Sequence, residues 1–149
     1  MERRKFLKTA GIGMAAGAVS MPVMAQNGPE LKWRFVSAYP KSLDTVFGAG
    51  ETISKLVAQA TGGKFQIKVF AAGEIVPTPG VLDAVKDGTV EMGHASSYYF
   101  VGKDPTFALD CTVPFGLNAR QTTAWLYEGG GMPLLREFFK EYNIFNIPC

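Results

Sequence analysis

The fold is decided by the stretch Phe65-Gln66-Ile67-Lys68-Val69-Phe70, in which apolar and polar side chains alternate up to Val69. A period of two is that of a β-strand, because successive side chains of a strand point to opposite faces of a sheet. Residues 31–36 alternate in the same way before they end in an apolar pair, and residues 90–95 follow as a third candidate. We therefore expect strands at 31–36, 65–70 and 90–95.

The first two strands are separated by a segment with helical periodicity, residues 44–60. Its apolar side chains recur every three or four positions and predict one face directed at the core, made of Val46, Ala49, Ile53, Leu56, Val57 and Ala60. Ser42 or Asp44 can cap the start of this helix, and the glycines at 62 and 63 end it. A short helix is expected over 81–86. Strands that alternate with helices favour βαβ units and an α/β fold with a mostly parallel sheet.

Shorter signals follow the third strand. In chain order they predict an aromatic-rich loop over 96–105, a buried apolar run over 107–113, a helix over 119–127 capped by Asn118, a break at Gly129-Gly130-Gly131 and a helix over 133–142. The last residues, 143–149, look like the opening of another strand. A domain rarely stops there, so we expect the sequence to be incomplete.

The first 25 residues are expected to be an export signal. Arg3-Arg4 stand ahead of Phe6-Leu7-Lys8 in the pattern of a twin-arginine signal. A short apolar stretch follows over 10–19, and Val23-Met24-Ala25 forms a small-residue cleavage site. We expect the twin-arginine (Tat) export machinery to deliver residues 26–149 to the periplasm.

The net charge of +2 belongs to this signal. Four of the 15 basic residues and one of the 13 acidic residues lie in it, so residues 26–149 carry 11 basic and 12 acidic side chains. A chain without a basic run lacks the electrostatic footprint of nucleic-acid binding. Cys111 and Cys149 could pair in an oxidising compartment, but a buried thiol and a terminal thiol are the favoured interpretation.

Catalytic patterns are scarce. His94 is the single histidine, and one histidine without a second histidine or a cysteine pair does not make a zinc site. No Gly-x-Ser-x-Gly motif or phosphate-binding loop occurs. We therefore interpret His94 as structural, and we expect neither an enzyme nor a metal in this chain.

Tyrosines follow two of the expected strands. One loop carries Tyr39 after the first strand, and another carries Tyr98 and Tyr99 after the third. In an open α/β sheet, ligands bind outside the carboxyl ends of the strands. A tyrosine ring can form a pocket wall while its hydroxyl binds a small polar ligand. The alternative is that these rings cover edges of the core, and spacing alone does not separate the two.

Several segments resemble the solute receptors of TRAP transporters, of the DctP type. They are Ser42-Leu43-Asp44, Phe65–Phe70, Ala72-Gly73-Glu74-Ile75-Val76-Pro77, Tyr98-Tyr99-Phe100-Val101-Gly102-Lys103-Asp104-Pro105, Val113-Pro114-Phe115-Gly116-Leu117-Asn118-Ala119-Arg120 and Gly129-Gly130-Gly131. The similarity is greatest to the branch that binds 2-oxo acids or lactate-like hydroxy acids.

The resemblance implies a periplasmic binding protein of type II. Such a protein has two lobes, closes on a small organic acid and hands it to membrane permease subunits. Residues 26–149 would be an incomplete N-terminal lobe. Tyr99 would donate a hydroxyl hydrogen bond to the solute, and Tyr98 and Tyr39 would form pocket walls. Phe100 and Val101 stand where relatives can carry a tyrosine and another aromatic, which makes the local pocket less polar or smaller.

Family members are considerably longer than this chain. The arginine that would clamp the solute carboxylate, and the residues with which some relatives hold a metal ion, would lie beyond Cys149. None of Arg34, Arg120 and Arg136 matches that clamp. We therefore expect the chain alone to bind solute weakly or not at all. The alternative function is a stand-alone periplasmic enzyme or interaction domain that reuses this lobe.

Overall fold

The computed structural model describes residues 30–111 and 113–148. The expected export signal at 1–25 lies outside these residues, as does Cys149. Within the described part of the chain, no helix is long and apolar enough to cross a membrane.

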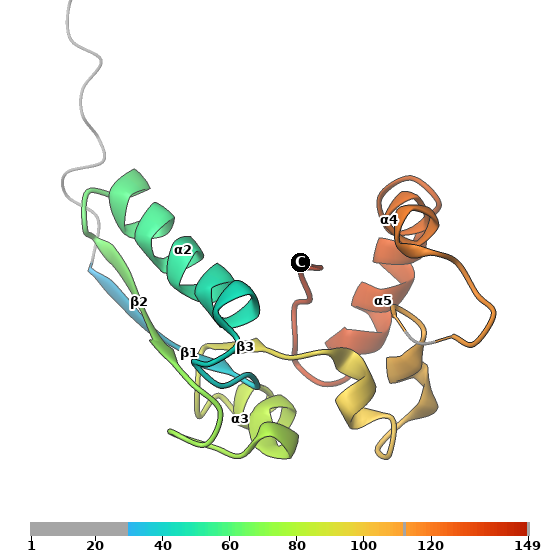
Figure 1. The fold of residues 1–149 in the computed structure, drawn as a ribbon, viewed down its shortest axis with the longest axis horizontal. Coiled ribbons are helices and arrows are strands. Elements are labelled where there is room, and N and C mark those ends of the chain that lie inside the picture. The colour runs from blue at the N-terminus through green and yellow to red at the C-terminus, as the bar shows by residue number, and fades with distance from the viewer. Residues whose placement is uncertain (1–29, 112, 149) are drawn as a thin grey trace, which may run out of the picture.

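Three parallel strands form the sheet, as the alternation of strands with helices along the sequence predicts. They are β1 (Leu31–Ser37), β2 (Phe65–Phe70) and β3 (Met92–His94), in the order β2-β1-β3. β1 pairs with β2 along six residues, from Leu31↔Phe65 to Val36↔Phe70, and with β3 from Phe35↔Met92 to Ser37↔His94. The central strand therefore ends beside the carboxyl ends of both neighbours (Figure 1).

β3 is shorter than the expected strand at 90–95. The Val90 N–H donates to the Ala84 carbonyl, and so this residue closes the preceding helix instead of joining the sheet. At the next position, the Glu91 side chain accepts the Arg34 N–H at 2.7 Å. The backbone N–H groups of Val90 and Arg34, which a longer β1–β3 ladder would use, thus donate to other acceptors.

Helices α2 (Asp44–Ala60) and α3 (Val81–Lys86) have the bounds that the sequence predicts and lie on opposite faces of the sheet. Phe35 of β1 faces α2, where its ring lies against Gly50. The next residue, Val36, points the other way into a core that includes Val81 and Leu82 of α3. Figure 1 shows α2 running along the sheet and α3 near its carboxyl end.

The predicted inner face of α2 is wrong. Its buried residues are Phe47 and Gly50, whereas Val46, Ile53 and Leu56 are exposed. Helical periodicity identifies an apolar stripe on α2, but it does not determine which of two adjacent stripes packs against the sheet. The large ring of Phe35 decides this, because it needs a residue without a side chain opposite it. Leu43, rather than Ser42 or Asp44, occupies the N-cap position, although the Asp44 carboxylate accepts the Thr45 N–H of the first turn at 2.8 Å.

The second half of the chain is built from short helices. η3 (Ser97–Phe100) and η4 (Pro105–Ala108) replace parts of the expected aromatic loop and apolar run, and α4 (Ala119–Tyr127) and α5 (Gly131–Lys140) follow. Asn118 caps α4 as predicted, in a reciprocal capping box with Gln121. α5 begins two residues earlier than expected, because Gly130 turns the chain with a φ of 83° just before it. It also ends two residues earlier, at Lys140.

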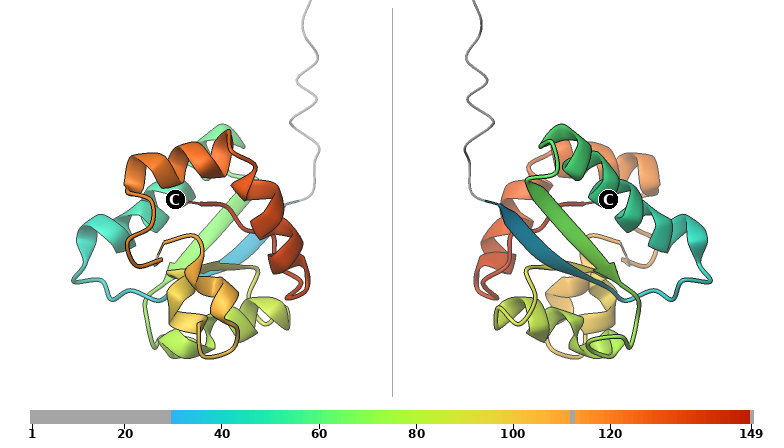
Figure 2. Two further views of the ribbon diagram at one scale, coloured as in Figure 1. Left: turned by 90° about the vertical axis from the view of Figure 1, so that its right-hand side faces the viewer. Right: turned by 90° about the vertical axis from the view of Figure 1, so that its left-hand side faces the viewer.

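Phe107 of η4 joins these helices into one core. Its ring packs edge-on or tilted against those of Phe100, Phe138, Phe139 and Tyr142, with centroids 4.9 to 5.8 Å apart. The same core contains Val36 of the sheet, so it links the two halves. The right-hand view of Figure 2 shows the elements of the second half behind the sheet. Two other apolar residues of the expected buried run, Leu109 and Val113, are each about half exposed.

Residues 143–148 form no strand, contrary to expectation. Asn143 has a left-handed φ of 55°, and the Ile144 N–H donates to the Phe139 carbonyl at 3.1 Å. This is the pattern by which a chain closes the carboxyl end of a helix. Ile144 packs on the core and helps to end α5, whereas Phe145 and Ile147 are exposed.

Candidate functional site

Side-chain contacts join β1 and β3 at their last paired residues and again in the loops that follow. Ser37 Oγ lies 3.4 Å from His94 Nδ1, and the Tyr39 hydroxyl lies 2.6 Å from Ser96 Oγ. Both pairs are 57 residues apart, which is the separation of the paired backbone residues of the two strands. The two loops that leave the carboxyl ends of these strands are therefore held together.

Tyr39 is held at both of its ends. Its N–H donates to Ser37 Oγ at 3.1 Å, and its carbonyl accepts the Ala72 N–H at 3.1 Å. The far end of the side chain reaches Ser96. The ring is half-buried and packs edge-on against the His94 ring, with centroids 5.0 Å apart.

The short helix η3 presents Tyr98 and Tyr99 outward. A 3₁₀-helix has three residues per turn, so residues i and i+3 share a face. Ser97 and Phe100 have this spacing and are buried, the first bonded to the Asp110 carboxylate and the second in the core. Tyr98 and Tyr99 therefore lie on the opposite face, where 38% and 39% of their surface is exposed.

The structure brings all three sequence-predicted tyrosines together. The Tyr98 and Tyr99 rings are 4.6 Å apart in an edge-on arrangement, and the Tyr39 and Tyr99 rings are 6.3 Å apart. A hydrogen bond with Tyr98, followed by desolvation and the neighbouring Tyr39, raises the pKa of Tyr99 to about 12. Its hydroxyl is thus a neutral hydrogen-bond donor at neutral pH. We call Tyr39, Tyr98 and Tyr99 the tyrosine cluster.

His94 lies behind the tyrosine cluster. It ends β3, is half-buried, and burial lowers its pKa below the usual 6.5. A neutral ring can accept a hydrogen bond at Nδ1 from the Ser37 hydroxyl, whose oxygen already accepts the Tyr39 N–H. Ser37 is 1% exposed, so this serine and histidine form an enclosed support. This agrees with the interpretation of His94 as structural.

Basic side chains near these loops already have acidic partners. Lys41 pairs with Glu74 at 2.6 Å, Arg34 pairs with Glu91 at 2.6 Å, and Lys103 pairs with Asp83 at 2.9 Å. Across residues 30–111 and 113–148, no group of three or more His, Cys, Asp or Glu side chains could hold a metal ion. The tyrosine cluster can therefore offer hydroxyl donors and ring surfaces, but the described residues do not add a metal site.

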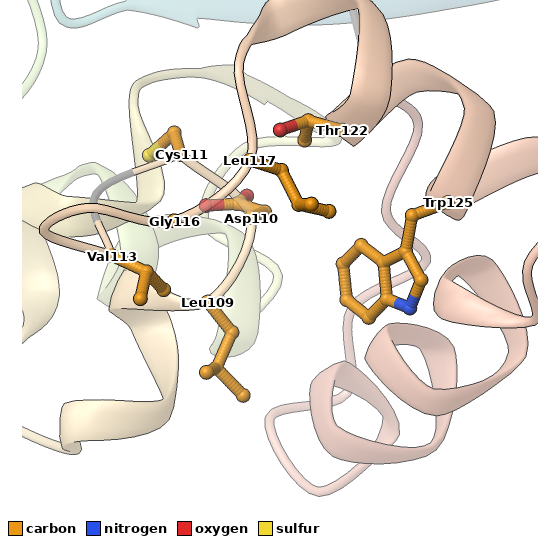
Figure 3. A pocket seen from close by; sticks show the side chains of 8 residues that line it. All are labelled: Leu109, Asp110, Cys111, Val113, Gly116, Leu117, Thr122 and Trp125. Atoms are coloured by element: carbon orange, nitrogen blue, oxygen red, sulfur yellow. The ribbon is translucent and has the colours of Figure 1, made fainter.

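A separate hollow of about 230 Å³ lies between the 109–117 segment and α4 (Figure 3). Leu117 and Trp125 point into it, and Asp110 supplies a carboxylate at its wall. None of the three tyrosines lines this hollow. A solute carboxylate would meet the negative charge of Asp110 there, so the hollow does not suit an anion.

Cys111 also borders this hollow, as a free thiol that is exposed rather than buried as expected. Its sulfur lies 3.6 Å from Ser97 Oγ, and desolvation raises its pKa. A raised pKa keeps the thiol protonated and poorly nucleophilic.

Comparison with known proteins gives consistent results. Residues 36–147 match the family profile described as bacterial extracellular solute-binding protein, family 7, or DctP. A monocarboxylate 2-oxoacid-binding periplasmic protein from a Nostoc species is 47% identical over 155 aligned residues, which cover 100% of this chain and 42% of that protein.

Solved structures show the same fold. A TRAP transporter solute-binding protein from Bordetella bronchiseptica, with calcium and picolinate in its active site, is 46% identical with a TM-score of 0.79 over 82% of this chain and 36% of that one. A TRAP periplasmic solute-binding protein from Colwellia psychrerythraea, with calcium and pyruvate, is 31% identical with a TM-score of 0.70 over 76% and 34%.

The chain thus spans less than half the length of each of these relatives. Its α/β fold, its parallel sheet and nearly all of its described residues nevertheless fall within one family. The chain belongs to the DctP family of bacterial extracellular solute-binding proteins, whose members are binding proteins and whose curated relative is periplasmic.

Proposed function

We propose that this chain is one lobe of a TRAP-type solute receptor, and that its tyrosine cluster contacts a small carboxylate such as a 2-oxo acid or a hydroxy acid. The convergence of three tyrosines at the carboxyl ends of β1 and β3 carries the proposal. Relatives that cover the same part of the fold are described with pyruvate or picolinate, both of which are carboxylates.

The chemistry of the tyrosine cluster fits an oxygen acceptor. A neutral phenol donates one hydrogen bond, and hydrogen bonds to charged acceptors are stronger than neutral ones. Tyr99 keeps its proton far above neutral pH and is the proposed donor to the solute. Tyr98 and Tyr39 present ring surface beside it and form the proposed walls.

Charge balance predicts that this lobe alone binds weakly. A carboxylate loses hydration when it is enclosed, and a guanidinium usually compensates for that loss. Arg34 is occupied by Glu91, and Arg136 lies over the ring of Phe145. In the complete receptor a second lobe would supply the clamp, and a solute that touches both lobes would favour closure.

The proposed wider context is the one in which such receptors work. The protein reaches the periplasm through the Tat machinery, which would recognise the two arginines at 3 and 4, and passes its solute to membrane permease subunits. Some relatives hold calcium with their solute, but the described residues of this chain do not fit a metal ion, so no step here depends on one.

An enzymatic function is disfavoured by the same geometry. Among the described residues, Ser37 and His94 place a hydroxyl beside an imidazole, but the serine is 1% exposed and already accepts the Tyr39 N–H. A nucleophile must be reachable by its substrate. We therefore propose a binding function without catalysis.

The five tyrosines of the chain allow a direct test. With ring-labelled tyrosine, NMR spectra give separate signals for the tyrosine cluster and for Tyr127 and Tyr142. Titration with pyruvate should shift the signals of the cluster, with a dissociation constant of about 1 mM or weaker. Propylammonium at equal concentration should not do so. Shifts confined to Tyr127 and Tyr142, or no shift at tens of millimolar pyruvate, would overturn the proposal.

A further inference from the structure

We infer that Ser96 is a positioning residue of this site, which fixes the hydroxyl of Tyr39 before any solute arrives. The inference rests on the proposed function for its consequence, although the contact itself is independent of it. Ser96 Oγ lies 2.6 Å from the Tyr39 hydroxyl, across the two loops that continue the β1–β3 ladder.

The remaining contacts of Tyr39 leave only its ring free to move. The backbone is fixed by Ser37, by Ala72 and, one residue earlier, by the Ala38 N–H bonded to the His94 carbonyl at 2.7 Å. The side chain has two further torsions, and Ser96 bonds the atom at its far end. Without that bond, the ring contacts with His94 and Tyr99 and the side-chain hydrogen bond with Tyr99 would remain to limit rotation.

Ser96 is itself well placed to serve as an anchor. It precedes η3, and its carbonyl accepts the Tyr99 N–H at 3.1 Å. The same residue thus bonds the Tyr39 side chain and the backbone of Tyr99. Because both tyrosines depend on one residue, their relative position is fixed by the fold and not by the solute.

A hydroxyl suits this role better than a group that only donates or only accepts. Either oxygen of the pair can be the donor. Ser96 can therefore accept the Tyr39 proton, or it can donate its own proton to the Tyr39 oxygen. Neither state leaves a hydroxyl oxygen without a partner, whose cost would otherwise oppose binding.

The first test uses the solute-free protein. Ser96→Ala should increase the ring mobility of Tyr39, measured by relaxation of its ring-labelled NMR signals, while Ser96→Thr should keep the wild-type behaviour because it retains the hydroxyl. Ser54→Ala is a matched control. The Ser54 hydroxyl of α2 also donates a hydrogen bond to another element, at the Ile67 carbonyl of β2, and neither residue belongs to the tyrosine loops. Ser54→Ala should lower the melting temperature and leave Tyr39 unchanged.

The second test measures pyruvate binding by the same signals. Ser96→Ala should weaken the dissociation constant about three- to tenfold, the usual range for one hydrogen bond, and Ser96→Thr should restore it. Unchanged Tyr39 mobility in Ser96→Ala would overturn the inference. If that mobility rises but wild-type protein does not respond to pyruvate, the proposed function fails while the positioning role of Ser96 stands.

Discussion

The ring of Phe35 and the backbone of Gly50 are in direct contact across the interface between β1 and α2. A Cβ placed on Gly50 would lie 2.7 Å from Phe35 Cε1, which is closer than non-bonded contacts of real Cβ atoms. Phe35 is 2% exposed and has little space into which to withdraw. This contact sets the side of α2 that faces the sheet.

Two glycines of α2 should respond oppositely to the same substitution. Gly50→Ala should destabilise the fold by about 1–3 kcal/mol, because the added methyl overpacks a closed interface. Gly48→Ala meets nothing within 4 Å and should stabilise it by roughly 0.5–1 kcal/mol through helix propensity. Urea unfolding of both variants measures the difference. Equal effects would show that α2 does not pack on Phe35 as described.

The two faces of α2 provide a second comparison. Phe47→Ala should cost roughly 3–5 kcal/mol, because the side chain is 4% exposed and a cavity would remain. Leu56→Ala should change the free energy of unfolding by less than about 0.5 kcal/mol, because the side chain is 57% exposed. A large loss of unfolding free energy in Leu56→Ala would instead support the inner face of α2 that the sequence alone predicted.

The joint between the two halves depends on Phe107. Phe107→Ala should cost roughly 3–5 kcal/mol, since the ring is 1% exposed and contacts four other aromatic rings. Phe115→Ala serves as the control, because that ring is fully exposed. Thermal unfolding followed by circular dichroism should show a markedly lower melting temperature only for Phe107→Ala.

Stability should fall below pH 6.5 because of His94. Burial lowers the pKa of His94 in the folded state, so the unfolded chain binds a proton more readily as the pH drops below 6.5. The loss continues until the pH reaches the folded-state pKa. Glu91, whose pKa its bonds to Arg34 lower to about 2, loses its contribution only below its usual 4.5.

The measurement is the melting temperature between pH 8 and pH 5. Wild-type protein should lose stability over this range, and His94→Gln should lose less, because no other histidine is present. An identical slope in both proteins would contradict the lowered pKa of His94.

The sequence predicted those parts of the structure that depend on neighbours along the chain. The strands expected at 31–36 and 65–70, the bounds of α2 and α3, and the Asn118 cap are local patterns, and the structure confirms them, with β1 one residue longer. The inner face of α2 is set by packing against Phe35 of a distant strand, and residues 143–148 close the carboxyl end of α5, and at both places the predictions were wrong.

The candidate site was likewise predictable from the sequence only in part. The topology of a parallel sheet placed the loops of Tyr39 and of Tyr98 and Tyr99 at one edge, and the structure brings these residues together. The contacts of Ser96 with Tyr39 and of Ser37 with His94 were missed, although His94 itself was interpreted as structural. Their signal is the common separation of 57 residues, which has meaning only once the register of β1 and β3 is known.

The central claim, that the tyrosine cluster binds a carboxylate through Tyr99, is tested most directly by pyruvate affinity in two matched variants. Tyr99→Phe removes the proposed donor, and Tyr127→Phe removes a hydroxyl from the exposed surface of α4. NMR titration should show binding about three- to tenfold weaker for Tyr99→Phe and unchanged for Tyr127→Phe. Equal affinity in Tyr99→Phe and wild-type protein would contradict the claim.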